Sequence, residues 1–103
     1  MPRAVAWMLE LLVRLRALRD LKEIWGYTAQ QWGVAQADQY LYDLDREIQG
    51  LLTFPELGTA CDHVRAGYRQ LQVKRHLVFY RRNGQGLEIV RVLHDAIDVK
   101  SHL

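Results

Sequence analysis

Cysteine is almost absent from this chain of 103 residues. Cys61 is the only one, so the chain cannot form an internal disulfide, and a metal cluster built from cysteines is excluded. A single thiol fits a protein that works in a reducing compartment. We therefore predict no metal site and no cofactor.

Long apolar runs are also missing. Residues 4–9 are apolar, but Glu10 and Arg14 follow closely, whereas a membrane span needs about 20 apolar residues. No small-residue cleavage site follows the run, which argues against a signal peptide. We expect a cytoplasmic protein without a membrane partner.

A strong excess of charge is the third absence. The formal net charge is +2, far less than proteins that follow an RNA backbone usually carry, so we expect no specific nucleic-acid binding. The charges are unevenly placed, however. Residues 61–103 hold eight Lys/Arg and four Asp/Glu, and all four histidines lie there too. Residues 1–60 hold six Lys/Arg and eight Asp/Glu. A basic surface of this kind suits an acidic peptide or, more weakly, a phosphate backbone, and an ordinary solvated sheet face has the same composition.

The length limits the chain to one domain. Half of the residues are hydrophobic, which allows one modest core, and a domain this short buries only about two-thirds of its unfolded surface. Its stability is therefore expected to be marginal. A partner that binds only the folded form would raise it by mass action.

Two helical stripes follow each other directly. The first comprises Leu18, Leu21, Ile24, Trp25, Thr28, Ala29 and Trp32, and the second comprises Val34, Ala37, Leu41, Leu44, Ile48 and Leu51. Gly33 between them suits a helix end that requires positive φ. Helices joined by so short a turn lie antiparallel, so we predict a helical hairpin. We interpret Trp25 and Trp32 as core residues in preference to ligand-stacking residues.

Beyond the loop at residues 53–60 the period of the apolar pattern changes to two. It predicts strands at residues 63–73, with a break at Gly67, at residues 75–82 and at residues 87–94. The sequence Asn83-Gly84-Gln85-Gly86 predicts a hairpin turn with positive φ. The last strand is apolar on both faces apart from Arg91, which predicts a central position.

The first sixteen residues fit a helix or a strand equally well. A helical hairpin followed by a three-stranded antiparallel sheet makes an α+β domain.

Six segments of the chain resemble the ParE family of plasmid-stabilisation toxins, which belongs to the RelE/ParE superfamily. In order they are Ala17-x-x-Asp20-Leu21-x-x-Ile24-Trp25-x-Tyr27-Thr28, Trp32-Gly33-x-x-Gln36-Ala37-x-x-Tyr40-Leu41, Pro55-x-Leu57-Gly58, Cys61-Asp62-x-Val64-Arg65-x-Gly67-Tyr68-Arg69, His76-x-Val78-Phe79-Tyr80-Arg81 and Glu88-Ile89-Val90-Arg91-Val92-Leu93-His94-x-x-x-Asp98.

The resemblance implies a RelE/ParE-like fold, with a strand at residues 9–14 lying at the sheet edge before the helical hairpin and three strands. It makes residues 1–103 a single toxin domain, with residues 1–8 as an extension and Met8 as the expected start. The chain departs from the family at Arg14-Leu15, where the family usually has a helix-starting Ser-Pro pair.

ParE toxins act on DNA gyrase, have no catalytic residue and are neutralised by a ParD-type antitoxin. The resemblance therefore implies a non-enzymatic gyrase inhibitor that forms a hetero-oligomer with a ParD-like antitoxin. Two alternatives stay open. One is a degenerate, non-toxic relative that only binds its partner. The other is a RelE-like, ribosome-dependent mRNA endoribonuclease, whose acid–base and phosphorane-stabilising groups would come from Tyr80, Arg81, Arg91, His94 and His102.

Two sets of binding residues are predicted. The basic C-terminal half supplies the candidates for contact with the target, namely Arg65, Tyr68, Arg81, His94 and Lys100. An acidic, amphipathic antitoxin that folds on the toxin is expected to contact Trp25, Tyr27, Trp32 and Arg69.

Overall fold

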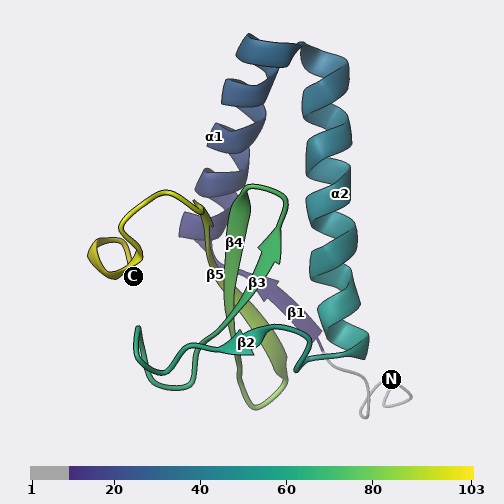
Figure 1. Ribbon diagram of the computed structural model, residues 1–103. Helices are drawn as coiled ribbons and strands as arrows, with labels where there is room; N and C mark the ends of the chain where they lie inside the picture. Colours follow the sequence, from purple (N-terminus) through teal and green to yellow (C-terminus); the bar gives the residue numbers. More distant parts are fainter. Residues whose placement is uncertain (1–9) are drawn as a thin grey trace.

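The computed structural model describes residues 10–103 and has the α+β architecture predicted from the sequence (Figure 1). The proposed extension at residues 1–8 lies outside the described residues. In chain order the elements are β1 (Glu10–Val13), α1 (Leu15–Trp32), α2 (Val34–Thr53), β2 (Thr59–Ala60), β3 (Arg69–Val73), β4 (His76–Arg82), β5 (Gly86–His94) and the short 3₁₀ helix η2 (Val99–Ser101).

The strands form one sheet in the order β1-β5-β4-β3-β2. β1 pairs in parallel with β5 and occupies an edge, as expected from the family resemblance, and the other pairs are antiparallel. The sheet has five strands, because β1 and the two-residue β2 flank the three antiparallel strands that were predicted, and of these two only β2 was not expected. β5 is an interior strand, but the middle position belongs to β4.

The predicted strand at residues 63–73 was wrong for residues 63–68. This segment forms turns, in which Cys61 O accepts from Val64 N and Arg65 O accepts from Tyr68 N. Gly67 has a φ of 82°, and its N–H donates to Asp62 Oδ1 over 2.8 Å. These local bonds satisfy the backbone in place of a ladder, so β3 begins only at Arg69.

The two helices bury one face each against the sheet. The buried residues are Ala17, Asp20, Ile24 and Thr28 in α1, and Ala37, Leu44, Ile48 and Leu51 in α2. Gly33 separates the helices with a φ of 96°, as predicted. The interpretation of the tryptophans as core residues was wrong, because Trp25 is 37% exposed and Trp32 is 73% exposed. The tip of the hairpin reaches beyond the sheet (Figure 1), and Trp32 is the last residue of α1, next to this tip.

α1 begins without the Ser-Pro start of the family. Arg14 is the N-cap residue and makes no side-chain cap. Its side chain points instead to β5, where Nε donates to Glu88 Oε1 over 2.9 Å. The entry to the helix is therefore fixed by an ion pair to the sheet.

The hairpin turn before β5 forms at the predicted place but by a different mechanism. Among the described residues no positive φ occurs at residues 83–86. Asn83 Oδ1 accepts from the N–H groups of Gln85 and Gly86 over 2.8 and 2.7 Å, which is an Asx-type turn. Gly86 is required for another reason, since a Cβ there would collide with the backbone of Glu10 in β1.

The sheet has a core on each face. The larger one, under the helices, is centred on the fully buried Leu44, Leu51, Tyr80, Leu87 and Ile89. The smaller one lies under the residues 61–68 turn and the C-terminal segment, and consists of Cys61, Tyr68, Phe79, Val90 and Leu93, flanked by Val64, Leu77, Ile97, Val99 and Leu103.

Candidate functional site

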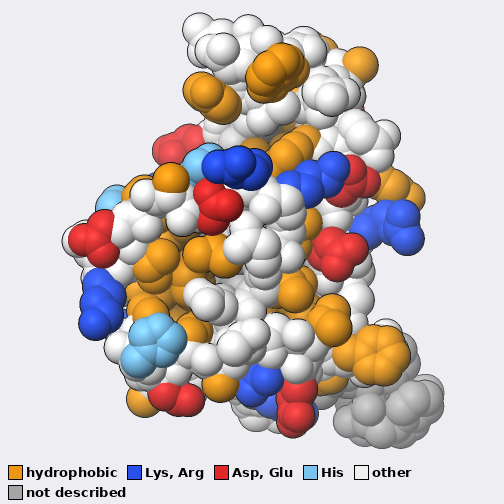
Figure 2. Space-filling view, viewed as in Figure 1, with side chains coloured by type: hydrophobic (Ala, Val, Ile, Leu, Met, Phe, Trp, Pro, Cys, Tyr) orange, Lys and Arg blue, Asp and Glu red, His pale blue; other side chains and the backbone are white. Residues whose placement is uncertain are grey.

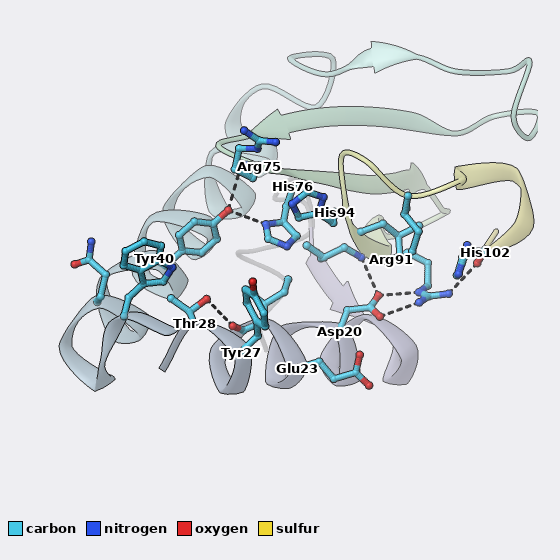
Figure 3. A pocket seen from close by; sticks show the side chains of 16 residues that line it. Asp20, Glu23, Tyr27, Thr28, Tyr40, Arg75, His76, Arg91, His94 and His102 are labelled. Atoms are coloured by element: carbon cyan, nitrogen blue, oxygen red, sulfur yellow. Dashed lines mark hydrogen bonds and ion pairs between the residues drawn. The ribbon is translucent and has the colours of Figure 1, made fainter. Parts of the chain in front are cut away.

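An open groove of about 760 Å³ lies between the helical hairpin, the ends of β4 and β5, and the C-terminal segment. Figure 3 shows how side chains from these separate elements point into it. Its lining consists of Asp20, Glu23, Ile24, Tyr27, Thr28, Trp32, Gln36, Tyr40, Arg75, His76, Arg91, Val92, Leu93, His94, Ile97 and His102.

Aromatic residues of the hairpin form one side of the groove. Tyr27 is 65% exposed and Trp32 is 73% exposed. Between them on α1, the Thr28 hydroxyl donates to Ile24 O over 2.7 Å and is therefore satisfied within the helix. Figure 2 shows apolar side chains at the hairpin tip, separated by a band of charged groups from those in the body below. This side of the groove suits an apolar occupant.

The floor is closed by an ion pair between α1 and β5. Arg91 Nε and Nη2 donate to the two carboxylate oxygens of Asp20 over 2.7 and 2.8 Å, and both side chains are nearly buried (Figure 3). Asp20 also accepts from Val92 N over 2.9 Å. β1 ends at Val13, opposite Ile89, so Asp20 supplies the acceptor that a continuing strand would have offered. The carboxylate raises the pKa of Arg91 above its ordinary value.

A hydrogen-bonded cluster lies at the other end of the floor. The Tyr40 hydroxyl lies 2.7 Å from His76 Nδ1 and accepts from Arg75 N over 3.2 Å. The His76 ring stands edge-on to the His94 ring, with centroids 5.3 Å apart. Burial lowers the pKa of His76, and the neighbouring His94 lowers it further. This geometry fits a neutral His76 ring whose Nδ1 accepts a hydrogen bond from the Tyr40 hydroxyl.

The structure brings together only part of the predicted antitoxin-contact set. Tyr27 and Trp32 line the groove. Trp25 lies on the side of α1 that faces α2, where Nε1 donates to Asp38 Oδ1 over 2.9 Å. Arg69 lies away from the groove and donates to Gly58 O over 2.7 Å, near the start of β2.

The predicted target-contact residues fall into separate places. Arg65 and Tyr68 neighbour each other on the residues 61–68 turn, and Tyr68 is largely buried. His94 lies at the groove end of β5, whereas Arg81 pairs with Glu88 at the opposite end of the same hairpin. Lys100 is exposed in η2. They do not make one continuous patch.

The nuclease candidates are brought together only in part, because Arg91, His94 and His102 line the groove whereas Tyr80 and Arg81 do not. Tyr80 is fully buried, and its hydroxyl donates to Pro55 O over 2.7 Å and accepts from Gly58 N over 3.0 Å. Arg91 is held by Asp20, and Arg81 lies far along the strand from His94. His94 and His102 do line the groove. Within residues 10–103 no group of His, Cys, Asp or Glu is arranged to hold a metal ion, and no helix could cross a membrane.

Several groove residues were absent from the predicted binding sets. These are chiefly Asp20, Gln36, Tyr40 and His76, together with Arg75. The first four stand at quoted positions of the ParE-like segments, which was the available signal. Their meeting depends on α1, α2 and the β4–β5 hairpin packing together, and a single sequence does not reveal this.

A helical hairpin packed on a sheet with an edge strand parallel to β5, beside an open groove, defines a small α+β domain of the RelE/ParE-like class. Residues 11–99 match the model of a family described as the ParE toxin of the type II toxin-antitoxin system parDE. The chain belongs to this family.

Named relatives agree with this assignment. Toxin ParE1 of Mycobacterium tuberculosis strain H37Rv is 46% identical over 88 residues, which cover 84% of this chain and 90% of the relative. Toxin ParE1 of Caulobacter vibrioides is 42% identical, with coverage of 85% and 91%. A solved structure titled "Chromosomal ParDE TA system from P. aeruginosa" shares the fold, with a TM-score of 0.76 at 20% identity over 84% of this chain and 96% of that chain.

Proposed function

We propose that this ParE-family chain inhibits DNA gyrase and is neutralised by a ParD-like antitoxin that docks in the groove. The observation that supports the proposal best is the open apolar groove in a chain whose family model names a toxin–antitoxin pair. On this proposal the chain acts by binding, as a cytoplasmic protein.

The groove matches the chemistry of an amphipathic segment. Tyr27 and Trp32 offer exposed aromatic surface to apolar anchors, and aromatic residues carry much of the binding energy at interfaces. Arg75 at the other end is exposed and only loosely paired with Asp95, at 3.5 Å, so it can also attract a carboxylate of the segment. A disordered antitoxin tail that orders on binding can cover a surface of this shape.

The arrangement of the nuclease candidates favours binding over catalysis. A general acid and a general base must both reach the reacting atoms, yet the Tyr80 hydroxyl is buried and fully bonded. The Arg91 guanidinium is occupied by Asp20. Among the five candidates only Arg91, His94 and His102 line the groove.

Expression of the chain in bacteria that lack the antitoxin tests the proposal. We expect growth arrest with a DNA-damage response, relieved when the antitoxin is co-expressed. Arrest of translation without DNA damage would favour the RelE-like alternative. Normal growth with the folded protein present would leave only the non-toxic relative.

A further inference from the structure

A second, smaller hollow of about 120 Å³ lies beside the first, beyond the Arg91 side chain. Its walls come from the start of α1, the residues 61–68 turn, β5 and the C-terminal segment. The lining is Arg14, Arg16, Arg65, Tyr68, Val90, Arg91, His102 and Leu103. Four guanidinium groups from three separate parts of the chain therefore surround one small space.

The carboxylates near this hollow are already engaged. Glu88 accepts from Arg14 through one oxygen and from Asn83 through the other. Both oxygens of Asp20 are bonded to Arg91. Glu88 and Asp20 thus neutralise Arg14 and Arg91, and Arg91 Nη1 also donates to His102 O over 2.8 Å. The positive charge in excess at the hollow is that of Arg16 and Arg65.

Donor groups are also left over. Among residues 10–103, Arg16 has no ion-pair partner. Arg65 donates to the Leu103 main-chain oxygen over 3.0 Å through one nitrogen of its guanidinium. The guanidinium carbon of Arg65 lies 5.9 Å from the centroid of the Tyr68 ring. Arginines gathered in this way repel one another unless an anion lies between them.

We propose that this hollow binds a phosphate group. Arg16 and Arg65 line the hollow from two parts of the chain and keep guanidinium N–H groups for the oxygens of a tetrahedral phosphate, to which arginine binds with paired hydrogen bonds, while Arg14 and Arg91 add positive charge beside them. A single planar carboxylate would engage fewer of them. The hollow, at about 120 Å³, has room for one phosphate group.

The site is independent of the antitoxin groove and of the gyrase proposal. Arg16 and Arg65 line the hollow and do not line the groove, whereas Arg91 and His102 lie in the wall between the two. Phosphate binding can therefore be measured on the isolated chain, whether or not the chain inhibits gyrase.

The test is an NMR titration of the ¹⁵N-labelled chain with inorganic phosphate, compared with chloride at the same ionic strength. We expect phosphate to cause saturable chemical-shift changes at residues that line the hollow, and chloride to cause no saturable change there. Arg16→Gln and Arg65→Gln should each weaken binding about tenfold, as expected for the loss of a charge-assisted hydrogen bond. Arg82→Gln is the matched control, because Arg82 is exposed and lies outside the hollow, and it should bind as the unmodified chain does.

Shifts that are equal in phosphate and chloride would overturn the proposal. The proposal would also be overturned if Arg82→Gln lowered the affinity for phosphate as much as the other two variants do, because that would show only general charge attraction. A short DNA duplex added to the phosphate-bound chain then identifies the source. If the duplex displaces phosphate from the unmodified chain, and does so less well from Arg16→Gln, the site binds a nucleic-acid backbone. If phosphate stays bound in the presence of the duplex, the site binds free phosphate.

Discussion

Asp20 illustrates how one side chain can complete a sheet edge. Its carboxylate accepts from the Val92 backbone and pairs with Arg91 in a nearly buried position. Loss of its charge would leave the guanidinium of Arg91 without compensation, and breaking a buried ion pair on one side costs about 3–5 kcal/mol. We predict that Asp20→Asn, which keeps the shape, lowers the free energy of unfolding by several kcal/mol in a urea titration. A loss below about 1 kcal/mol would show that the pair is not needed for stability.

His76 is predicted to make the stability of the fold depend on pH. Its folded-state pKa lies below the ordinary value because the ring is partly buried and faces His94, although Asp95 and Asp20 act in the opposite direction. Protonation therefore favours the unfolded chain, so this contribution is present above about pH 6.5 and is lost as the pH falls through the folded-state pKa.

Urea unfolding at pH 7 and pH 5 tests this prediction. The free energy of unfolding should fall between the two values, and His76→Asn should lose less over the same interval than the unmodified chain. An equal loss in both proteins would assign the pH dependence to other groups.

Trp32 is predicted to anchor the antitoxin. It is exposed at the end of α1 and lines the groove, so Trp32→Ala should leave stability within about 0.5 kcal/mol. Affinity for the ParD-like antitoxin should fall by at least about tenfold, as is usual for a tryptophan anchor. Tyr42→Ala is the control in a calorimetric titration, because Tyr42 is exposed on α2 outside the groove. Equal affinities for the two variants would remove Trp32 from the interface.

At the scale of elements, the two helices show what periodicity can and cannot decide. The stripe predicted for α2 contains all four of its buried residues. In α1 the predicted stripe included Leu18, Trp25 and Trp32, which lie seven residues apart on one row of the helix and are exposed. That row satisfies the helical period as well as the buried face does. Only the position of the sheet shows which row is covered.

The turn and the short strands show a similar limit. The sequence indicated a turn at Asn83, but the side-chain carbonyl of Asn83 closes it without positive φ. Residues 63–68 have a strand-like pattern because Val64 and Tyr68 pack on the smaller core. These residues are apolar because they are buried beneath a turn, and an apolar pattern with a period of two was therefore mistaken for a strand.

The contact between β1 and β5 depends on one glycine. A side chain at Gly86 would strike the Glu10 backbone, whereas space around Gly84 is open. We predict that Gly86→Ala lowers the free energy of unfolding by about 1–3 kcal/mol through overpacking, and that Gly84→Ala changes it by less than about 0.5 kcal/mol. Hydrogen exchange should show faster opening of the Arg14 N–H, which donates to Ile89 O, in the first variant only. Equal exchange rates would show that β1 tolerates the side chain.

At the scale of the whole molecule, the sequence predicted the class of fold, the order of its main elements and the family, because many separated segments carry them. The candidate site was predicted only in part. Tyr27, Trp32 and His94 do line the groove, but Arg69, Arg81 and Lys100 do not. Charge and aromatic content identify residues suited to binding, whereas the groove forms only where the hairpin, the ends of β4 and β5 and the C-terminal segment pack together.

Inhibition of purified DNA gyrase tests the proposed function most directly. The purified chain should block supercoiling of relaxed plasmid and cause cleaved DNA to accumulate, and an equimolar amount of the ParD-like antitoxin should restore activity. Asp20→Asn should inhibit gyrase in proportion to the fraction of the protein that is folded. Tyr42→Ala, which is expected to fold normally, should inhibit gyrase as strongly as the unmodified chain. Unaffected gyrase, together with ribosome-dependent mRNA cleavage that His94→Ala abolishes, would contradict the proposal and identify the chain as a nuclease.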